Sequence, residues 1–215
     1  ETSIAVPVSI TAVGAGELQR RAINNVDGIA RLVPTLIVGE GGGTVQGGII
    51  AIRGLAGADN NPLNDQAVSF NVDGVGVGRA TVRRMSELDV QQVEVLKGPQ
   101  ALFFGKNSPA GIISIRSADP TPDFQAKLTA GYEFKAREIR TEGYVSGPLT
   151  DSLGFRVAAS LSDMKGWAKS YVPRTGTANI FPPEHFRAPN KTDWAVRGTL
   201  KFDNGGAFNA RAKLT

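Results

Sequence analysis

Apolar and polar residues alternate with a period of two through most of the chain after residue 124. The alternation covers residues 126–134, 139–146 and 153–162, and it resumes at 194–201 and 208–215 after a Pro- and Gly-rich loop expected at residues 168–190. A period of two predicts β-strands with one apolar and one polar face. Each strand is about ten residues long, which matches the ~9–11 residues of a tilted membrane-spanning strand. We expect five such strands in antiparallel order.

The first part of the chain shows short, mixed patterns broken by glycine. Residues 16–22 predict one helix, and Asn24 or Asn25 can cap a second one that ends before Pro34. Two further strands are expected within residues 93–116, where they flank a turn region that is rich in glycine and proline. The remaining short strands are expected at residues 7–13, 35–38, 49–53 and 67–72. These elements predict a small α+β domain over residues 1–118, and the composition of residues 119–123, DPTPD, predicts a linker.

The alternation after residue 124 has two interpretations that periodicity alone does not separate. A soluble antiparallel sheet with one wet face shows the same pattern as a membrane-spanning sheet. Basic residues fall on the polar phase, where they would line a lumen, and this argues against the single exposed basic surface of a nucleic-acid-binding protein. Aromatic residues near the strand ends would suit the two membrane interfaces. They are Tyr132, Phe134, Trp167, Trp194 and Phe202.

Charge and composition narrow the classes of function. The formal net charge is +4, and residues 123–215 carry the basic excess, with fourteen of the 24 Lys and Arg and nine of the 20 Asp and Glu. The chain has no cysteine, so disulfides and thiolate metal sites are excluded. No run of ~18 apolar residues and no leader with a basic start and an apolar core is present. We therefore expect a mature, trimmed or partial chain.

Two glycine-rich segments resemble nucleotide-binding loops only superficially. Residues 98–108 have the wrong glycine spacing for a phosphate loop, and Asn107 stands where Ser or Thr would hold magnesium. Residues 74–78, which are expected to form a loop, read GxGxG, whereas a dinucleotide fingerprint is GxGxxG. The lone His185 lies in a Pro-rich stretch, and without cysteine it predicts neither a zinc site nor a catalytic triad. We expect no metal site, no cofactor and no enzymatic activity.

The order of the motifs in residues 6–123 resembles the TonB-dependent outer-membrane receptors of Gram-negative bacteria. The matching pieces, in order, are PVSITAV with a GEL helix, VDGIARLVP, IAIRGLA, FNVDGV, VEVLKGPQALFFGKNSPAGIISIRS and ADPTPDF. No single piece is very specific, and the match depends on their order and spacing. The strands after residue 124 are similar to the start of the family's barrel only in their alternation of apolar and polar residues. With this resemblance the membrane interpretation of the alternation is preferred.

The resemblance implies an α+β plug domain at residues 1–118, a linker at 119–123, and the first strands of an antiparallel transmembrane β-barrel at 124–215. In the family the plug fills a barrel of 22 strands, so we expect this chain to be a fragment. The implied partners are outer-membrane lipid, the TonB complex, and a scarce large nutrient, most often a ferric siderophore. Cobalamin, haem and carbohydrate are other substrates of the family. The short box that TonB contacts is expected upstream of Glu1.

The resemblance also suggests roles for individual residues. Arg53, Glu94 and Lys97 are expected to lock the plug to the barrel wall, although all three could be ordinary surface charges. A second set is expected to serve backbone geometry: Gly54, Gly74, Gly98, Pro99, Gly105 and Gly111. A third set lies in loops that would face the substrate, where ordinary solvated loops are an equal alternative: Asn60, Asn61, Arg79, Arg83 and Arg84.

These expectations lead to two hypotheses of different class. The first is a receptor that transports its substrate with energy from TonB. The second is a non-transporting plug or barrel component of a larger outer-membrane assembly, with a binding or structural role.

Overall fold

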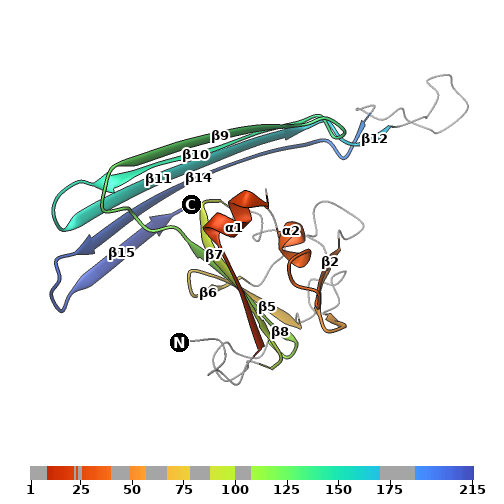
Figure 1. Cartoon of the computed structure of the whole chain (residues 1–215), viewed down its shortest axis with the longest axis horizontal. Coiled ribbons are helices and arrows are strands. Elements are labelled where there is room, and N and C mark those ends of the chain that lie inside the picture. The colour runs from red at the N-terminus through yellow and green to blue at the C-terminus, as the bar shows by residue number, and fades with distance from the viewer. Residues whose placement is uncertain are drawn as a thin grey trace, which may run out of the picture. The chain divides into compact units, whose positions relative to one another are not determined.

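The computed structural model describes residues 9–21, 23, 26–39, 49–56, 67–77, 88–99, 108–169 and 187–215. The chain divides into two compact units, residues 1–118 and 119–215. Each unit has its own sheets, and we describe the two units separately (Figure 1).

A mixed five-stranded sheet forms the centre of the first unit. Its strands are β1 (Ser9–Gly14), β5 (Val68–Val72), β6 (Val75–Gly76), β7 (Val90–Lys97) and β8 (Gly111–Ser117), in the order β1-β7-β8-β5-β6. All neighbours are antiparallel except β5 and β8, which run parallel. Strands β7 and β8 are the two strands expected within residues 93–116, and they pair with each other directly.

Two short helices and a second sheet complete the first unit. Helix α1 (Ala15–Arg20) follows β1, and α2 (Val26–Ala30) precedes β2 (Leu36–Gly39). Strand β2 pairs with β3 (Ile49–Ile52), which pairs with β4 (Leu55–Ala56). The core is built mainly from β-branched and leucine side chains of both sheets and both helices, together with Phe70, which is almost fully buried.

One prediction for this unit was wrong in part. The glycine-rich segment after β5 was expected to be a loop, but Val75–Gly76 forms β6 and pairs back onto β5. The reason is the turn at Asp73 and Gly74, whose φ angles are 50° and 87°. Two consecutive residues with positive φ form the tight hairpin turn whose twist matches that of the strands.

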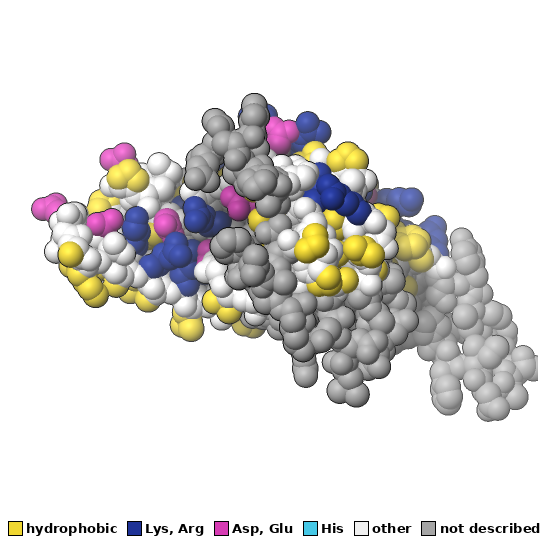
Figure 2. Space-filling model, turned by 90° about the horizontal axis from the view of Figure 1, so that it is seen from below, with side chains coloured by type: hydrophobic (Ala, Val, Ile, Leu, Met, Phe, Trp, Pro, Cys, Tyr) yellow, Lys and Arg dark blue, Asp and Glu magenta, His cyan; other side chains and the backbone are white. Residues whose placement is uncertain are grey.

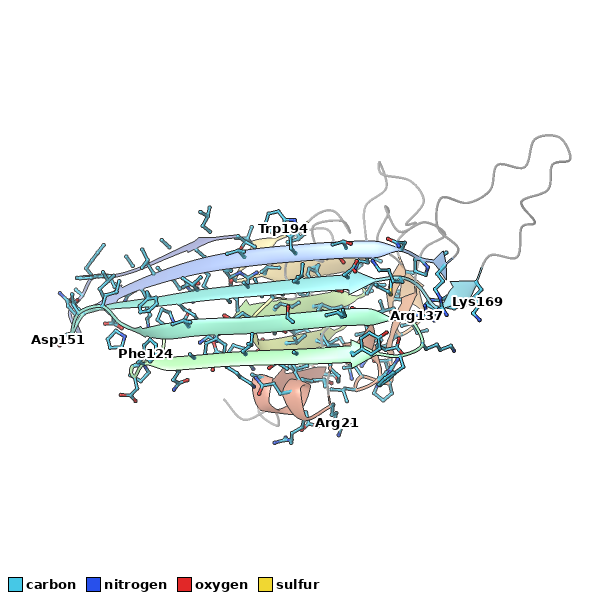
Figure 3. The ribbon with its side chains drawn as sticks, turned by 90° about the horizontal axis from the view of Figure 1, so that it is seen from above. Arg21, Phe124, Arg137, Asp151, Lys169 and Trp194 are labelled. Carbon is cyan, nitrogen blue, oxygen red and sulfur yellow. The ribbon has the colours of Figure 1, made fainter. Side chains whose placement is uncertain are left out.

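The second unit is an antiparallel meander of long strands. Its strands are β9 (Gln125–Glu133), β10 (Glu138–Pro148), β11 (Leu153–Met164), β14 (Lys191–Asp203) and β15 (Asn209–Leu214), in the order β15-β14-β11-β10-β9. Figure 3 shows them side by side, with Phe124 and Asp151 at one end and Arg137 and Lys169 at the other. The small pair β12 (Ala168–Lys169) and β13 (Arg187–Ala188) lies within the long β11–β14 connection, which was expected to be loop throughout.

Within the described residues, no helix is long and apolar enough to span a membrane.

Candidate functional site

The long sheet of the second unit has an apolar face that is strongly exposed. In the register of the strands, Leu128 is aligned with Gly143, Ala159 and Val196, and such alignments put all apolar phases on one face. The exposed fraction is 80% for Leu128, 75% for Trp194 and 48% for Leu161. A water-soluble sheet would cover so large an apolar surface with another layer. The exposed face therefore favours contact with lipid over the soluble alternative.

Aromatic side chains mark the two borders of this face. Tyr132 is aligned across the sheet with Thr192, and Phe202 lies ten residues further along β14. Ten steps span roughly 33 Å along a strand. At a barrel tilt of ~40° this corresponds to a height of about 25 Å, which is the height of the apolar band of an outer-membrane barrel.

The opposite face of the sheet is polar and rich in basic residues. Its basic side chains on the five strands are Lys127, Arg140, Arg156, Lys191, Arg197, Lys201, Arg211 and Lys213. Figure 2 shows Lys and Arg side chains gathered with Asp and Glu on the left of the view, where the sheet lies. The guanidinium carbon of Arg156 lies 3.7 Å from the centre of the Tyr144 ring, a cation–π contact. This face offers positive charge and hydrogen-bond donors.

The segment before β9 is fastened to this polar face. Asp119 forms ion pairs with Arg211 at 3.1 Å and with Lys213 at 3.6 Å, both on β15. Thr121 donates its backbone N–H to the hydroxyl oxygen of Ser146 on β10 at 2.9 Å. Residues 119–121 are therefore bound both to β15, at one edge of the sheet, and to β10, next to the opposite edge. Sequence composition identified the segment as a linker but gave no sign of these contacts, because Asp119 and Arg211 are 92 residues apart.

The last residues of the first unit are held inside that unit. Ser117 donates its N–H and its hydroxyl to the two carboxylate oxygens of Asp73, at 3.0 and 2.5 Å. The N–H of Ala118 donates to the carbonyl oxygen of Asp89 at 2.9 Å. In the sequence, Asp73 is distinguished only as part of the FNVDGV motif. A non-glycine residue with positive φ in the turn is the structural mark that distinguishes it.

The three residues expected to form a lock are not in contact with one another. Arg53 is exposed in the turn between β3 and β4, in the smaller sheet. Glu94 and Lys97 are three residues apart on β7, so their side chains leave opposite faces of the strand. Glu94 accepts a hydrogen bond from Gln92 at 3.0 Å. Among the described residues no ion pair joins any two of the three, so a lock would have to act through separate partners.

Four of the six residues expected to serve backbone geometry are glycines with positive φ. The angles are 79° at Gly54, 87° at Gly74, 102° at Gly98 and 146° at Gly111. Gly111 also has a packing reason, since a Cβ there would lie 2.3 Å from the carbonyl oxygen of Leu96. Pro99 directly follows Gly98 and is exposed.

Several expected residues lie outside the described part of the chain. They are Gly105, Asn60, Asn61, Arg79, Arg83 and Arg84, together with Asn107 and His185. In the part of the chain that is described, no three His, Cys, Asp or Glu side chains gather as a metal site would require.

Comparison with known proteins gives consistent results at the levels of family, sequence and fold. The family model "TonB-dependent Receptor Plug Domain" matches residues 2–112. The pesticin receptor of Yersinia pestis is 33% identical over 147 residues, which cover 68% of this chain and 21% of that protein. The iron-regulated outer membrane virulence protein of Vibrio cholerae is 25% identical over 162 residues, which cover 70% of this chain and 24% of that protein. The chain thus spans between a fifth and a quarter of the length of these relatives.

Solved structures share the fold. The ferric yersiniabactin uptake receptor from Yersinia pestis matches with a TM-score of 0.66 at 24% identity, over 94% of this chain and 29% of that one. The pyoverdine outer membrane receptor from Pseudomonas aeruginosa matches with a TM-score of 0.74 at 22% identity, over 99% of this chain and 28% of that one. On the family match, the chain belongs to the TonB-dependent receptors of the Gram-negative outer membrane and contains their plug domain followed by antiparallel strands.

Proposed function

We propose that this chain is the plug and the first barrel strands of a receptor that takes up a ferric siderophore with energy from TonB. The observation that carries the proposal is the joining of a plug-family unit to a sheet that is apolar and exposed on one face and basic on the other. The relatives support the substrate class, because structures of similar fold include receptors named for yersiniabactin and pyoverdine.

The polar face is suited to line the path of the substrate. Many ferric chelates are anionic, and Arg and Lys bind anionic oxygen atoms through charge-assisted hydrogen bonds. Arg156 and Arg197 are nearly buried basic residues of this face. The loop residues Arg79, Arg83 and Arg84, with Asn60 and Asn61, would add donors where the substrate arrives from outside. In the proposed mechanism the substrate binds these loops, and TonB then pulls the N-terminal end of the plug and opens a path to the periplasm.

Arg53, Glu94 and Lys97 are proposed to lock the plug in the barrel until TonB acts. Their positions in two sheets and on two faces of β7 mean that each needs its own partner. Dispersed ion pairs that the barrel buries would add little net stability, but they can fix register and can be released as a switch.

The direct test is uptake by cells that express the full-length receptor. Radioactive iron would be supplied on a panel of siderophores, with and without a protonophore and in a strain that lacks TonB. We expect at least one ferric siderophore to accumulate, and we expect both treatments to abolish its accumulation. Accumulation that persists without TonB would contradict the energy coupling.

Native mass spectrometry of the purified receptor distinguishes two alternatives. A receptor of the same family could carry haem, cobalamin or a carbohydrate, and native mass spectrometry of the purified full-length protein against these compounds would detect it. A non-transporting component of a larger outer-membrane assembly would bind none of them and would remain in a stable complex with other outer-membrane proteins.

A further inference from the structure

We propose that residues 119–121 are a fixed anchor that stays fastened to the barrel wall while the plug is moved. The proposal rests on the proposed function, since it concerns where a pull on the plug ends. It assigns positioning roles to Asp119, Thr121, Ser146 and Gly154. The support comes from three contacts of different chemistry, made to three different strands.

The first contact is ionic and ties the segment to β15. Asp119 pairs with both Arg211 and Lys213, and its side chain is 31% exposed, compared with 13% for Lys213. A carboxylate that is bound by two cations on one strand is held by two charge-assisted contacts. The pair of contacts therefore holds the start of the segment against the sheet.

The second contact is a saturated hydrogen-bond group on β10. Ser146 is fully buried and donates its hydroxyl to the carbonyl oxygen of Phe155 at 3.1 Å. Its oxygen accepts the N–H of Thr121 at 2.9 Å and lies 3.0 Å from the Thr121 hydroxyl. Release of Thr121 would leave the buried Ser146 oxygen short of a donor, which is costly inside a protein.

The third contact is made possible by glycine on β11. A Cβ at Gly154 would lie 2.9 Å from the Cβ of Pro120, and a Cβ at Gly147 would lie 3.1 Å from the Cα of Phe124. Glycine at these positions lets the segment lie directly against the strands. Any larger residue at Gly154 would push Pro120 away from the sheet.

The plug holds its own end of the chain equally firmly. Ser117 is bound by Asp73, and the N–H of Ala118 is bound by Asp89. In the described structure no unanchored stretch lies between these bonds and Asp119. A pull at the N-terminal end of the plug would therefore end at an anchored residue of the barrel wall, which can keep the plug attached while its other parts rearrange.

Hydrogen exchange on the full-length receptor tests the anchor without any need for transport. Ser146→Ala removes the acceptor of the Thr121 N–H, and Gly154→Ala displaces Pro120. We expect the amides of Thr121, Asp123 and Phe124 to exchange about tenfold faster in either variant; residues 120 and 122 are prolines and carry no amide hydrogen. Ser160→Ala is the matched control, because it makes the same change on the polar face of the neighbouring strand β11. Ser160 is aligned with Glu142, four residues along β10 from Ser146, and so lies away from the segment. Unchanged exchange in both anchor variants would overturn the proposal.

A disulfide tests whether the anchor stays closed during transport. The chain has no cysteine, so the double variant Thr121→Cys with Ser146→Cys adds one defined pair. The hydroxyl oxygens lie 3.0 Å apart, which brings sulfur atoms at these positions within reach of each other. We expect the disulfide to form under mild oxidation and to leave TonB-dependent uptake unchanged. Failure to form, or uptake lost on oxidation and restored by a reductant, would each contradict a fixed anchor.

The two proposals fail in distinguishable ways. If the unaltered receptor transports no substrate, the proposed function is wrong, whereas the exchange result still decides whether the segment is fastened. If the unaltered receptor transports and the oxidised double variant does not, the function stands and the anchor is wrong.

Discussion

At the scale of single residues, Gly111 is required by both its backbone conformation and its packing. It has a φ of 146°, and an added Cβ would meet the Leu96 carbonyl oxygen at 2.3 Å and the Ile52 Cδ1 atom at 2.9 Å. We expect Gly111→Ala to lower the stability of the β7–β8 pair by roughly 2–4 kcal/mol, since a steric clash is added to backbone strain. Hydrogen exchange of the β7 and β8 amides in the full-length receptor measures this loss.

Gly98→Ala is the control that separates the two causes. Gly98 has a φ of 102°, but nothing lies within 4 Å of an added Cβ. We expect its replacement to cost only the backbone strain, about 1–2 kcal/mol. If both variants lose the same amount, packing against Leu96 and Ile52 is not the reason for glycine at position 111.

A pH effect is expected at Glu17 of α1. Its carboxylate is hydrogen-bonded by Arg20 and Arg21, and these bonds hold its pKa below the ordinary value for glutamate. A lowered pKa in the folded state means that the stabilisation is present above the pKa of the unfolded chain and is lost as the pH falls through the folded pKa. The effect is small because the pairs are exposed.

The comparison of Glu17→Gln with the unaltered receptor shows this effect. The melting temperature of the variant should be slightly lower at pH 7, and the difference should disappear when the pH is brought below the folded pKa of Glu17. A difference that persists in acid would mean that the carboxylate charge is not its cause.

The local sequence can indicate the backbone conformation of a single residue where a short turn joins two strands. The positive φ values of Gly54 and Gly74 follow from their places in two-residue turns, which a strand–X-Gly–strand pattern indicates. The positive φ of Arg53 could not be predicted in this way, because arginine has no preference for that conformation. Asp73 was missed as the partner of Ser117, since the bond joins residues 44 apart along the chain.

At the scale of elements, the two faces of the long sheet should respond differently to the same charge. Ala159 is exposed on the apolar face in the middle of the band, and Thr129 is exposed on the polar face. We expect Ala159→Arg to destabilise the receptor in lipid vesicles by about 2–4 kcal/mol, as an arginine does at the midplane of a bilayer. Thr129→Arg should change stability little. Unfolding in urea measures both.

Equal tolerance of the two substitutions would favour the soluble alternative that periodicity could not exclude. Periodicity did predict the existence, order and antiparallel pairing of the five long strands, because each strand must keep one apolar and one polar face. It could not predict β6, β12 or β13, since two-residue strands are too short to show a period. Their positions depend on turn geometry and on the pairing partner.

At the scale of the whole molecule, the sequence predicted the architecture but not the connections within it. Order and spacing of the plug motifs, followed by long alternating strands, were sufficient for the fold class. The three contacts of residues 119–121 depend on which residues of β15, β11 and β10 the sheet brings together, and no local pattern contains that information. The cargo is likewise absent from the sequence pattern, because relatives of similar fold are named for different siderophores.

The orientation of the sheet in the membrane is a further prediction at this scale. Outer-membrane barrels have short turns on the periplasmic side and longer loops outside. The 149–152 turn and the 204–208 connection lie at one end of the sheet, and the long 165–190 connection begins at the other. Figure 3 shows the corresponding positions, with Asp151 at the first end and Lys169 at the second. We therefore expect Asp151 to face the periplasm and Lys169 to face the outside.

Single cysteines at these two exposed positions can report the orientation, because the chain has none of its own. A maleimide that cannot cross the outer membrane should label Lys169→Cys in intact cells. It should label Asp151→Cys only after the outer membrane has been permeabilised, and the unaltered receptor shows the background at both steps. Labelling of Asp151→Cys in intact cells would contradict the prediction and would mean that the sheet has the opposite orientation in the membrane. The fastened segment, which enters the sheet at the Phe124 end, would then lie on the outer side of the membrane and not on the periplasmic side.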